Sequence, residues 1–273
     1  MVDQSAAFVG DIPHFYDTGL GPMIFVDYAD EMVRRAGAAH PMRVLETAAG
    51  TGIVTRKLRD LLPAGTRLTA TDLNPAMLQV AAAKFREGEQ VEFEPADAMA
   101  LPFPDRSFDL VVCQFGVMFF PDKDKSYSEV HRVLAPGGRY LFNVWDSHRY
   151  NAFGRIAHET GVRLFPADPP GFYRVPFGYH QIDPIKESLI GAGFAPISAT
   201  ILGRTKRIPD SLAFARAMVY GNPLIDQIRQ RGGVDPDRVV DAILEEMRRE
   251  FGADPGAMRI QAIIFEAEKP RES

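Results

Sequence analysis

The sequence predicts an α/β fold in which an open sheet is flanked by helices. The clearest unit lies at residues 43–62, where a short apolar run ends at Glu46 and a turn of small residues follows. Apolar residues then recur at helical spacing, at Val54, Leu58, Leu61 and Leu62. A second run, 108–113, is apolar almost throughout, as expected for a central strand that is covered on both faces.

The glycine-rich turn Thr47–Gly52 is the first candidate binding element. In an open α/β sheet, a turn of this kind lets a nucleotide-like ligand approach the backbone beside a helix N-terminus. The strand 68–72 ends in Asp72, at about the 20-residue distance from Gly52 that suits a ribose-binding carboxylate. A plain tight turn between strand and helix is the alternative interpretation of the glycines.

The glycines do not complete the fingerprint of dinucleotide-binding proteins, since Thr55 stands where the third glycine would be when the motif is aligned at Gly50. The chain also lacks a phosphate-binding loop ending in Gly-Lys-Ser/Thr. The spacing Glu46-x-x-x-Gly50-x-Gly52 instead resembles the first motif of the class I S-adenosylmethionine-dependent methyltransferases.

A second match to that family follows the predicted strand 91–94. In the family, an acid here accepts a hydrogen bond from the adenine amino group, the next backbone amide meets the ring, and small or apolar side chains cover it. Asp97, Ala98 and Met99 match this pattern, although Asp97 could also be an ordinary turn residue. The passage from Leu101 to Gly138 resembles the ubiquinone/menaquinone-biosynthesis-like small-molecule methyltransferases (methyltransferase domain type 11).

This resemblance covers roughly residues 44–145. It implies a Rossmann-like seven-stranded sheet with strand order 3-2-1-4-5-7-6, the last strand antiparallel, flanked by helices and carrying helical lid insertions. The remaining elements are expected as helices at 23–36, 75–85, 122–134, 183–190, after Asp210 and from Asp235, and as strands at 139–145, 196–202 and 258–266. Asn74 and Asp183 are the expected caps of helices that begin with proline.

We expect one methyltransferase domain over residues 1–273. Residues 1–40 are interpreted as N-terminal lid helices, and 147–180 and 203–257 as helical insertions that form a substrate lid. Loops at the carboxyl edge of such a sheet carry function. The aromatic residues of the first insertion could equally build a small core of its own.

Composition limits the partners. The net charge of −5 and the absence of a long Lys/Arg run argue against nucleic acid. The near-apolar stretch 110–120 is too short to cross a bilayer, so no integral membrane association is expected. The single cysteine, Cys113, is expected in the core, and with no signal-peptide pattern it fits a cytoplasmic protein. A homodimer is left open.

The resemblance assigns the cofactor S-adenosyl-L-methionine, whose product is S-adenosyl-L-homocysteine. The cofactor-binding residues are predicted in the two motifs, beside the ribose and methionyl groups and in the N-terminal lid: Tyr16, Phe25, Glu46, Ala48, Gly50, Gly52, Asp72, Leu73, Met77, Asp97, Ala98, Met99, Gln114 and Phe115. Phe25 has packing on the sheet as its alternative. Gln114-Phe115-Gly116 departs from the Asn/Asp-Pro-Pro-aromatic motif of DNA amino-methylating enzymes, which counts against that activity.

Catalytic residues are harder to predict because a sulfonium methyl group is already activated. Positioning donor and acceptor can supply on the order of 7–11 kcal/mol, and a general base is needed only when the acceptor is protonated. Candidate bases are His14, Tyr16, His148 and His180, each with packing as the alternative. The histidines show no metal-ligand spacing, so no metal is predicted.

The predicted function is transfer of a methyl group from S-adenosylmethionine to an O, N or C atom of a small, partly apolar molecule by in-line displacement. A non-catalytic regulator that binds the cofactor or its product is one alternative. A nicotinamide-dependent oxidoreductase is another, which the incomplete glycine fingerprint and Asp97 disfavour.

Overall fold

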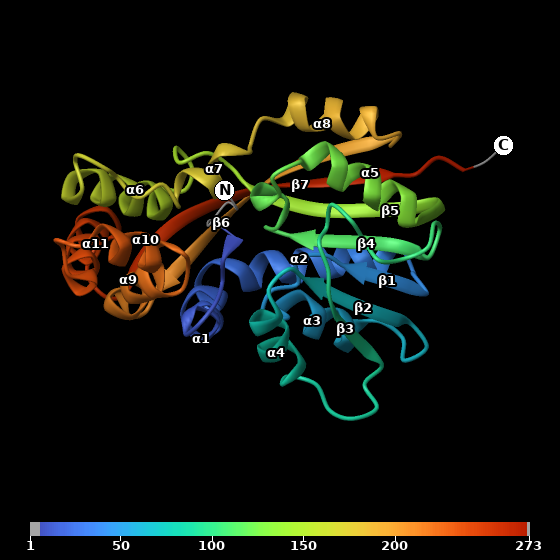
Figure 1. Ribbon diagram of the computed structural model, residues 1–273, viewed down its shortest axis with the longest axis horizontal. Helices are drawn as coiled ribbons and strands as arrows, with labels where there is room; N and C mark the ends of the chain where they lie inside the picture. Colours follow the sequence, from blue (N-terminus) through green and yellow to red (C-terminus); the bar gives the residue numbers. More distant parts are fainter. Residues whose placement is uncertain (1–5, 272–273) are drawn as a thin grey trace. The chain divides into compact units, whose positions relative to one another are not determined.

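The structure, a computed structural model, describes residues 6–271 of the 273-residue chain (Figure 1). The chain divides into two compact units. Unit 1 comprises residues 1–26, 145–179 and 202–262, and unit 2 comprises 27–144, 180–201 and 263–273. Nearly all of the two predicted insertions therefore falls in unit 1. Their role as a lid, like the description of 1–273 as one domain, stays a prediction.

Seven strands form one sheet in the order β3-β2-β1-β4-β5-β7-β6, which confirms the predicted order (Figure 1). β1 pairs in parallel with β2 on one side and with β4 on the other. β3 extends the sheet beside β2, and β5 extends it beside β4, again in parallel. The strands are β1 Arg43–Glu46, β2 Arg67–Asp72, β3 Val91–Pro95, β4 Phe108–Gln114, β5 Leu134–Trp145, β6 Ile197–Ile208 and β7 Gly256–Glu268.

β7 is antiparallel to its neighbours, as predicted. The N–H of Gly137 donates to the carbonyl of Lys269, and the N–H of Lys269 donates to the carbonyl of Gly138, each at 2.8 Å. The N–H of Ala195 and the carbonyl of Pro196, just before β6, likewise bond the backbone of Glu268. Reciprocal bonds of this kind are typical of antiparallel pairing.

The helices connect the strands in the expected alternation. They are α1 Ile12–Phe15, the π-helix η2 Tyr16–Phe25, α2 Val26–Ala38, α3 Ile53–Leu61, α4 Pro75–Ala82, the 3-10 turn η3 Val117–Phe119, α5 Lys123–Val133, α6 Ala152–Leu164, α7 Arg174–Gly178, α8 Ile182–Gly191, α9 Ser211–Tyr220, α10 Leu224–Arg231 and α11 Pro236–Phe251. No helix in the part of the chain that the structure describes is long and apolar enough to cross a membrane.

Several boundaries differ from the sequence prediction. β5 begins at Leu134, where it pairs with Phe108 of β4, and β6 continues to Ile208 beside β7, so both strands extend past their apolar segments. α10 was not predicted. Asn74 makes no side-chain cap, since its amide donates to Asp72 instead, and α8 begins at Ile182, before the expected Asp183 cap.

Unit 2 has its core around the central strands, whose middle residues are fully buried. Tyr140 and Phe142 of β5 stack at 4.7 Å between ring centres, and Phe142 stacks on Phe265 of β7 at 5.0 Å. Cys113 is also buried, which confirms its predicted place in the core. Burial raises the pKa of its thiol to about 11, so the thiol is neutral at physiological pH.

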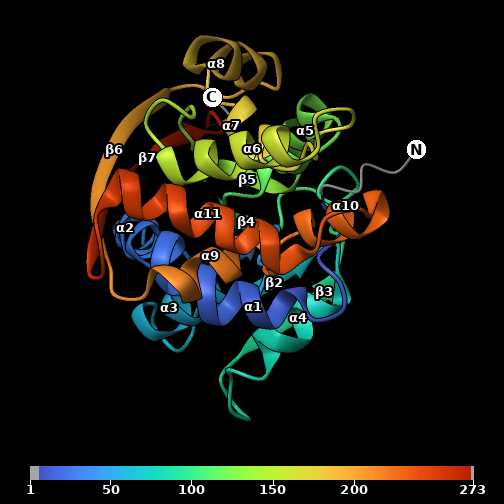
Figure 2. The ribbon, with the colours of Figure 1, turned by 90° about the vertical axis from the view of Figure 1, so that its left-hand side faces the viewer.

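Unit 1 has a helical core of its own, in which α11 packs against α9 and α6 (Figure 2). Phe153 of α6 lies at the centre, with its ring 5.5 Å from that of Phe177 and 6.2 Å from that of Phe214. Trp145, the last residue of β5, meets Phe153 edge-on at 5.6 Å. The interpretation of the aromatic insertion as a small core is thus confirmed for these residues.

Candidate functional site

The candidate site lies in unit 2, where the order of the strands reverses. The chain runs outward from β1 to β2 and β3 on one side, and from β4 to β5 on the other. Because these five strands are parallel, their carboxyl ends share one edge of the sheet. In open α/β sheets, ligands bind outside the carboxyl ends at such a reversal.

The turn between β1 and α3 is largely buried, and its backbone takes a left-handed conformation at three positions. Ala48, Gly50 and Gly52 all have positive φ, at 52°, 57° and 78°. A Cβ on Gly52 would stand 2.8 Å from the Cβ of Ala81, so only glycine fits between the turn and α4. Met77, also on α4, is buried and lies against Gly50, whose Cβ would be 3.5 Å from its methyl group. The predicted glycine positions therefore let this turn pack closely against α4 at the N-terminus of α3.

Asp72, at the end of β2, holds this turn. Its Oδ2 accepts from the N–H of Gly50 at 2.9 Å, and its Oδ1 accepts from the backbone N–H and the side-chain amide of Asn74, at 2.8 and 3.3 Å. Burial raises the pKa of Asp72, and these hydrogen bonds oppose the rise. A carboxylate offers roughly four lone-pair sites, so capacity remains for a ligand hydroxyl. Leu73, the next residue, is 57% exposed.

Glu46, at the end of β1, is almost fully buried. The hydroxyl of Thr55 on α3 donates to its Oε2 at 2.6 Å. Burial raises the pKa of Glu46 to about 8, the Thr55 hydrogen bond opposes the rise, and the charge of Asp72 adds to it. Thr55 was noted in the sequence only as a missing glycine. The structure gives it a role in orienting Glu46.

The segment after β3 is organised by Asp97. Its Oδ1 accepts from the N–H of Met99 at 2.8 Å, and its carbonyl accepts from the N–H of Ala100 at 2.9 Å. Ala98 between them is buried. Asp97 therefore does act as a turn residue, as the alternative interpretation held. This turn uses only Oδ1 of the Asp97 carboxylate, so Oδ2 could still accept a hydrogen bond from a ligand.

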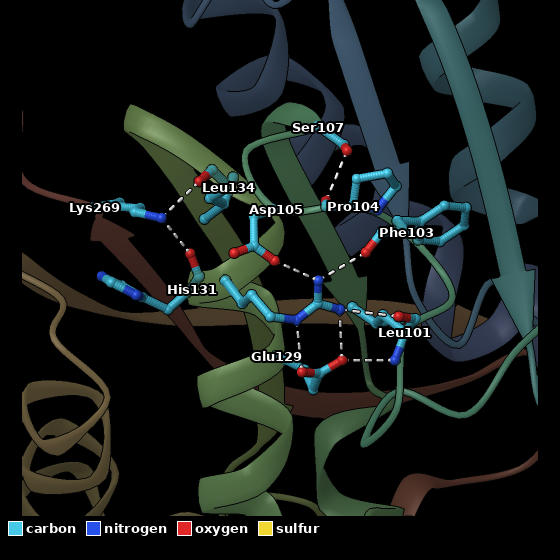
Figure 3. Close-up of polar contacts among 10 residues, drawn as sticks. Leu101, Phe103, Pro104, Asp105, Ser107, Glu129, His131, Leu134 and Lys269 are labelled. Atoms are coloured by element: carbon cyan, nitrogen blue, oxygen red, sulfur yellow. Dashed lines mark hydrogen bonds and ion pairs between the residues drawn. The ribbon is translucent and has the colours of Figure 1, made fainter.

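An arginine clamp that sequence reasoning missed fixes the loop that follows this segment (Figure 3). Arg132 of α5 donates to the carbonyls of Leu101 and Phe103, at 2.9 and 2.7 Å. Glu129 orients Arg132 through two bonds of 2.8 Å and also accepts from the N–H of Leu101 at 2.8 Å. In sequence, Glu129 and Arg132 look like an exposed helical pair, so no local signal distinguishes them.

The loop after β4 packs closely on the turn after β1. A Cβ on Gly116 would stand 2.5 Å from the Cβ of Ala48 and 2.8 Å from the sulfur of Cys113. Phe115 has a φ of 52°, and its N–H donates to Oδ1 of the buried Asn143 at 2.9 Å. Gln114 ends β4 beside Asn143 of β5. Asn143 was not predicted, and its position at a strand end is the only sequence signal for it.

Among residues 6–271, the buried polar atoms that lack a hydrogen-bond partner include Oγ1 of Thr51, in the glycine-rich turn, and Nδ2 of Asn143, next to Phe115. Buried polar groups are normally paired. These atoms, the glycine-rich turn and the acidic side chains of Glu46 and Asp72 together fit a polar ligand that carries hydroxyl and cationic groups, as S-adenosylmethionine does.

The other predicted residues are distributed between the units. Tyr16 and Phe25 belong to unit 1, where their rings stack at 4.9 Å, and the exposed His14 also lies there. His148 of unit 1 places Nε2 3.0 Å from the carbonyl of Tyr173, and burial lowers its pKa. His180 falls in unit 2. The contacts of His148 are those of a packing residue, and the roles of all five stay predictions.

Part of the chain that contains this edge of the sheet is similar to known methyltransferases. Residues 45–142 match the family described as "Methyltransferase domain". The chain is 39% identical over 127 residues to the demethylmenaquinone methyltransferase of Thermus thermophilus, which covers 46% of this chain and 57% of that protein. It is 44% identical over 110 residues to the ubiquinone/menaquinone biosynthesis C-methyltransferase UbiE of Hahella chejuensis, with 39% and 43% covered.

The fold is also found among solved structures. The YcgJ protein of Bacillus subtilis superimposes with a TM-score of 0.60 at 21% identity, over 90% of this chain and 99% of that one. The chain spans only about half the length of these two curated relatives. The residues 45–142 that match the family include the motifs at Glu46–Gly52, Asp72 and Asp97–Met99. Residues 45–142 of this chain are therefore similar to a methyltransferase domain.

Proposed function

We propose that unit 2 binds S-adenosylmethionine and that the chain transfers its methyl group to an O, N or C atom of a small, partly apolar molecule. The observation that carries the proposal is the hydrogen bond between Asp72 and Gly50. It joins the ends of β1 and β2 into one cradle in which a carboxylate faces a backbone free of side chains. That arrangement suits a ribose better than a pyrophosphate, because a carboxylate repels a phosphate.

Each part of the site has a distinct task in this proposal. Asp72 accepts from the ribose, while Asp97 and the N–H of Met99 recognise the adenine edge. Glu46 and the loop at Gln114 and Phe115 orient the methionyl portion. When bound, the cofactor supplies an activated methyl group on a cationic sulfur. The residues of this chain then contribute positioning and exclusion of water, which can account for on the order of 7–11 kcal/mol of the barrier.

The acceptor is proposed by its chemistry. Two relatives are named as methyltransferases of menaquinone and ubiquinone biosynthesis, which supports an aromatic or quinone-like acceptor with an apolar portion. We further propose that residues 1–40, 147–180 and 203–257 act as the substrate lid, with Tyr16 and Phe25 toward the cofactor. If the acceptor needs a base, His14, Tyr16, His148 and His180 are the candidates. We also propose that the protein is cytoplasmic and that it acts without nucleic acid.

The proposed cofactor binding is tested by calorimetric titration of the chain with S-adenosylmethionine, S-adenosylhomocysteine and NAD in parallel. We expect saturable binding of the first two, lost or strongly weakened in Asp72→Ala. Asp60→Ala is the matched control, because Asp60 is exposed and its one ion pair among residues 6–271 is with Arg56 of its own helix. Binding of NAD alone would overturn the proposal in favour of an oxidoreductase. Cofactor binding with no turnover across a screen of quinols, phenols and amines would favour the non-catalytic regulator.

A further inference from the structure

Unit 1 contains a cavity of about 720 Å³ that the proposed function does not use. It lies where β6 and β7 run side by side next to the end of α11 and the loop after β5 (Figure 2). A volume of this size is within the range of small-molecule sites, roughly 300–1,000 Å³. Its walls are Arg149, Tyr150, Ala152, Gly203, Arg204, Thr205, Glu250, Phe251, Ala257, Arg259, Ile260 and Gln261.

The charge of the cavity is strongly positive. Three arginines line it, and in the described part of the chain none of them pairs with a carboxylate. Arg149 lies over the ring of Tyr150 at 5.8 Å, and Arg204 donates only a long bond of 3.4 Å to the carbonyl of Gly203. The one carboxylate of the lining, Glu250, is already paired with Arg155 at 3.3 Å. The cavity is therefore suited to an anion.

The wall that carries Arg149 and Tyr150 is held rigidly by a buried asparagine. Asn151 donates through Nδ2 to the carbonyls of Asp146 and Gln261, both at 2.9 Å, and accepts through Oδ1 from the N–H of Gln261 at 2.9 Å. The side chain of Gln261 donates in turn to Oδ2 of Asp146 at 2.7 Å. These bonds fasten the loop after β5 to β7. The backbone at Arg149 is thus held in place before a ligand arrives, which lowers the entropy cost of binding.

The lining also offers apolar surface beside the charge. Tyr150 is 46% exposed and Phe251 is half-buried, so both rings can contact a ligand. The small residues Ala152, Gly203 and Ala257 also line the cavity. A ligand with one anionic end and one apolar end matches this distribution better than a bare ion does.

We propose that this cavity binds a phosphorylated small molecule. Its phosphate or diphosphate group would lie between Arg149, Arg204 and Arg259, and its apolar group would lie against Tyr150 and Phe251. Guanidinium groups bind phosphate through two parallel hydrogen bonds, which makes arginine the preferred side chain for such a group. The site is argued from unit 1 alone and does not depend on methyl transfer.

Titration of the full chain with inorganic pyrophosphate tests the anionic half. The double variant Arg149→Gln/Arg259→Gln should bind at least about ten-fold more weakly, since two charge-assisted contacts are lost. Arg238→Gln is the control, because Arg238 is an exposed arginine of unit 1 outside the cavity. No saturable binding by the parent chain, or an equal loss in Arg238→Gln, would overturn the proposal.

Further measurements test whether the variants are folded, whether Tyr150 contacts the apolar group, and whether the phosphate belongs to a soluble molecule or to a lipid. Thermal unfolding shows whether the double variant is folded, and Arg259→Lys, which keeps the charge, should fall between the parent and the glutamine variant. Phenyl phosphate should bind more tightly than inorganic phosphate, and Tyr150→Ala should remove the difference. Binding to phosphatidic acid vesicles, with no binding of either soluble phosphate, would count against a small-molecule site.

Discussion

The backbone N–H of Gly50 and the carboxylate of Asp72 lie 2.9 Å apart, although 22 residues separate them in the chain. The bond closes the glycine-rich turn onto the neighbouring strand. It also places a carboxylate with spare acceptor capacity at the edge where the strand order reverses. One hydrogen bond thus fixes both the shape of the turn and the position of the proposed ribose acceptor.

The first prediction concerns this bond. Asp72→Asn keeps the size of the side chain but loses the charge, and a hydrogen bond to a charged group contributes about 1.5–3 kcal/mol. We therefore expect affinity for S-adenosylhomocysteine to fall by about ten-fold or more in calorimetry. Asn74→Ala is the matched comparison, since it removes the 3.3 Å side-chain contact to Asp72 and leaves the Gly50 bond in place. Equal losses in both variants would contradict a special role for the Gly50 bond.

The second prediction is a pH dependence caused by Glu46. Burial raises its pKa to about 8 in the folded protein, from 4.5 in the unfolded chain. Between these values the folded state holds a proton that the unfolded state has released. The stability from this group is therefore fully present below the unfolded pKa and is lost as the pH rises through the folded pKa. The unfolding free energy should fall between about pH 5 and about pH 8, by a few kcal/mol at most.

Urea unfolding of Glu46→Gln checks this origin. The glutamine oxygen still accepts from Thr55 but does not titrate, so the fall in the unfolding free energy should be largely absent. Thr55→Val should have the opposite effect, because the Thr55 hydrogen bond lowers the pKa of Glu46 and its removal extends the fall to higher pH. A parent-like pH profile in Glu46→Gln would assign the dependence to another group.

The third prediction concerns the close contact between the loops after β1 and β4. Gly116→Ala places a Cβ against Ala48 and Cys113, and overpacking of this kind typically costs about 1–3 kcal/mol of stability. Because Ala48 belongs to the proposed cofactor turn, affinity for S-adenosylhomocysteine should fall as well. Gly65→Ala is the control, since a Cβ there meets nothing within 4 Å. Chemical unfolding and calorimetry on both variants measure the two effects.

The fourth prediction concerns the arginine clamp. Arg132→Lys cannot reach Leu101, Phe103 and Glu129 at once, because one ammonium group replaces a planar fork of donors. We expect a loss of about 1 kcal/mol in stability, limited by the partial exposure of the clamp, and weaker binding of S-adenosylhomocysteine through the loosened segment after Asp97. Arg139→Lys, whose only ion pair is a long contact of 3.9 Å with Glu268 among the described residues, should change neither quantity. Faster hydrogen exchange at Met99 and Leu101 in Arg132→Lys would locate the change.

The sequence, through the family it resembles, was enough for the strand order, and it also provided the residues of the proposed cofactor site. Asp72 and the turn at Gly50 and Gly52 are visible because a strand end, a glycine and a carboxylate at fixed spacing are local features. The buried strand β4 is visible because a strand covered on both faces is apolar throughout.

Only the tertiary structure decided which side chains meet. Thr55 reaches Glu46, Arg132 reaches the loop after Asp97, and Asn143 supports Phe115 because crossover helices and neighbouring strands bring distant segments together. The cavity of Arg149, Arg204 and Arg259 comes from three separate segments, each of which reads as an ordinary polar surface. Local sequence patterns are set by backbone preference and burial, whereas hydrogen-bond partners and cavities depend on the distances that folding creates between residues far apart in the chain.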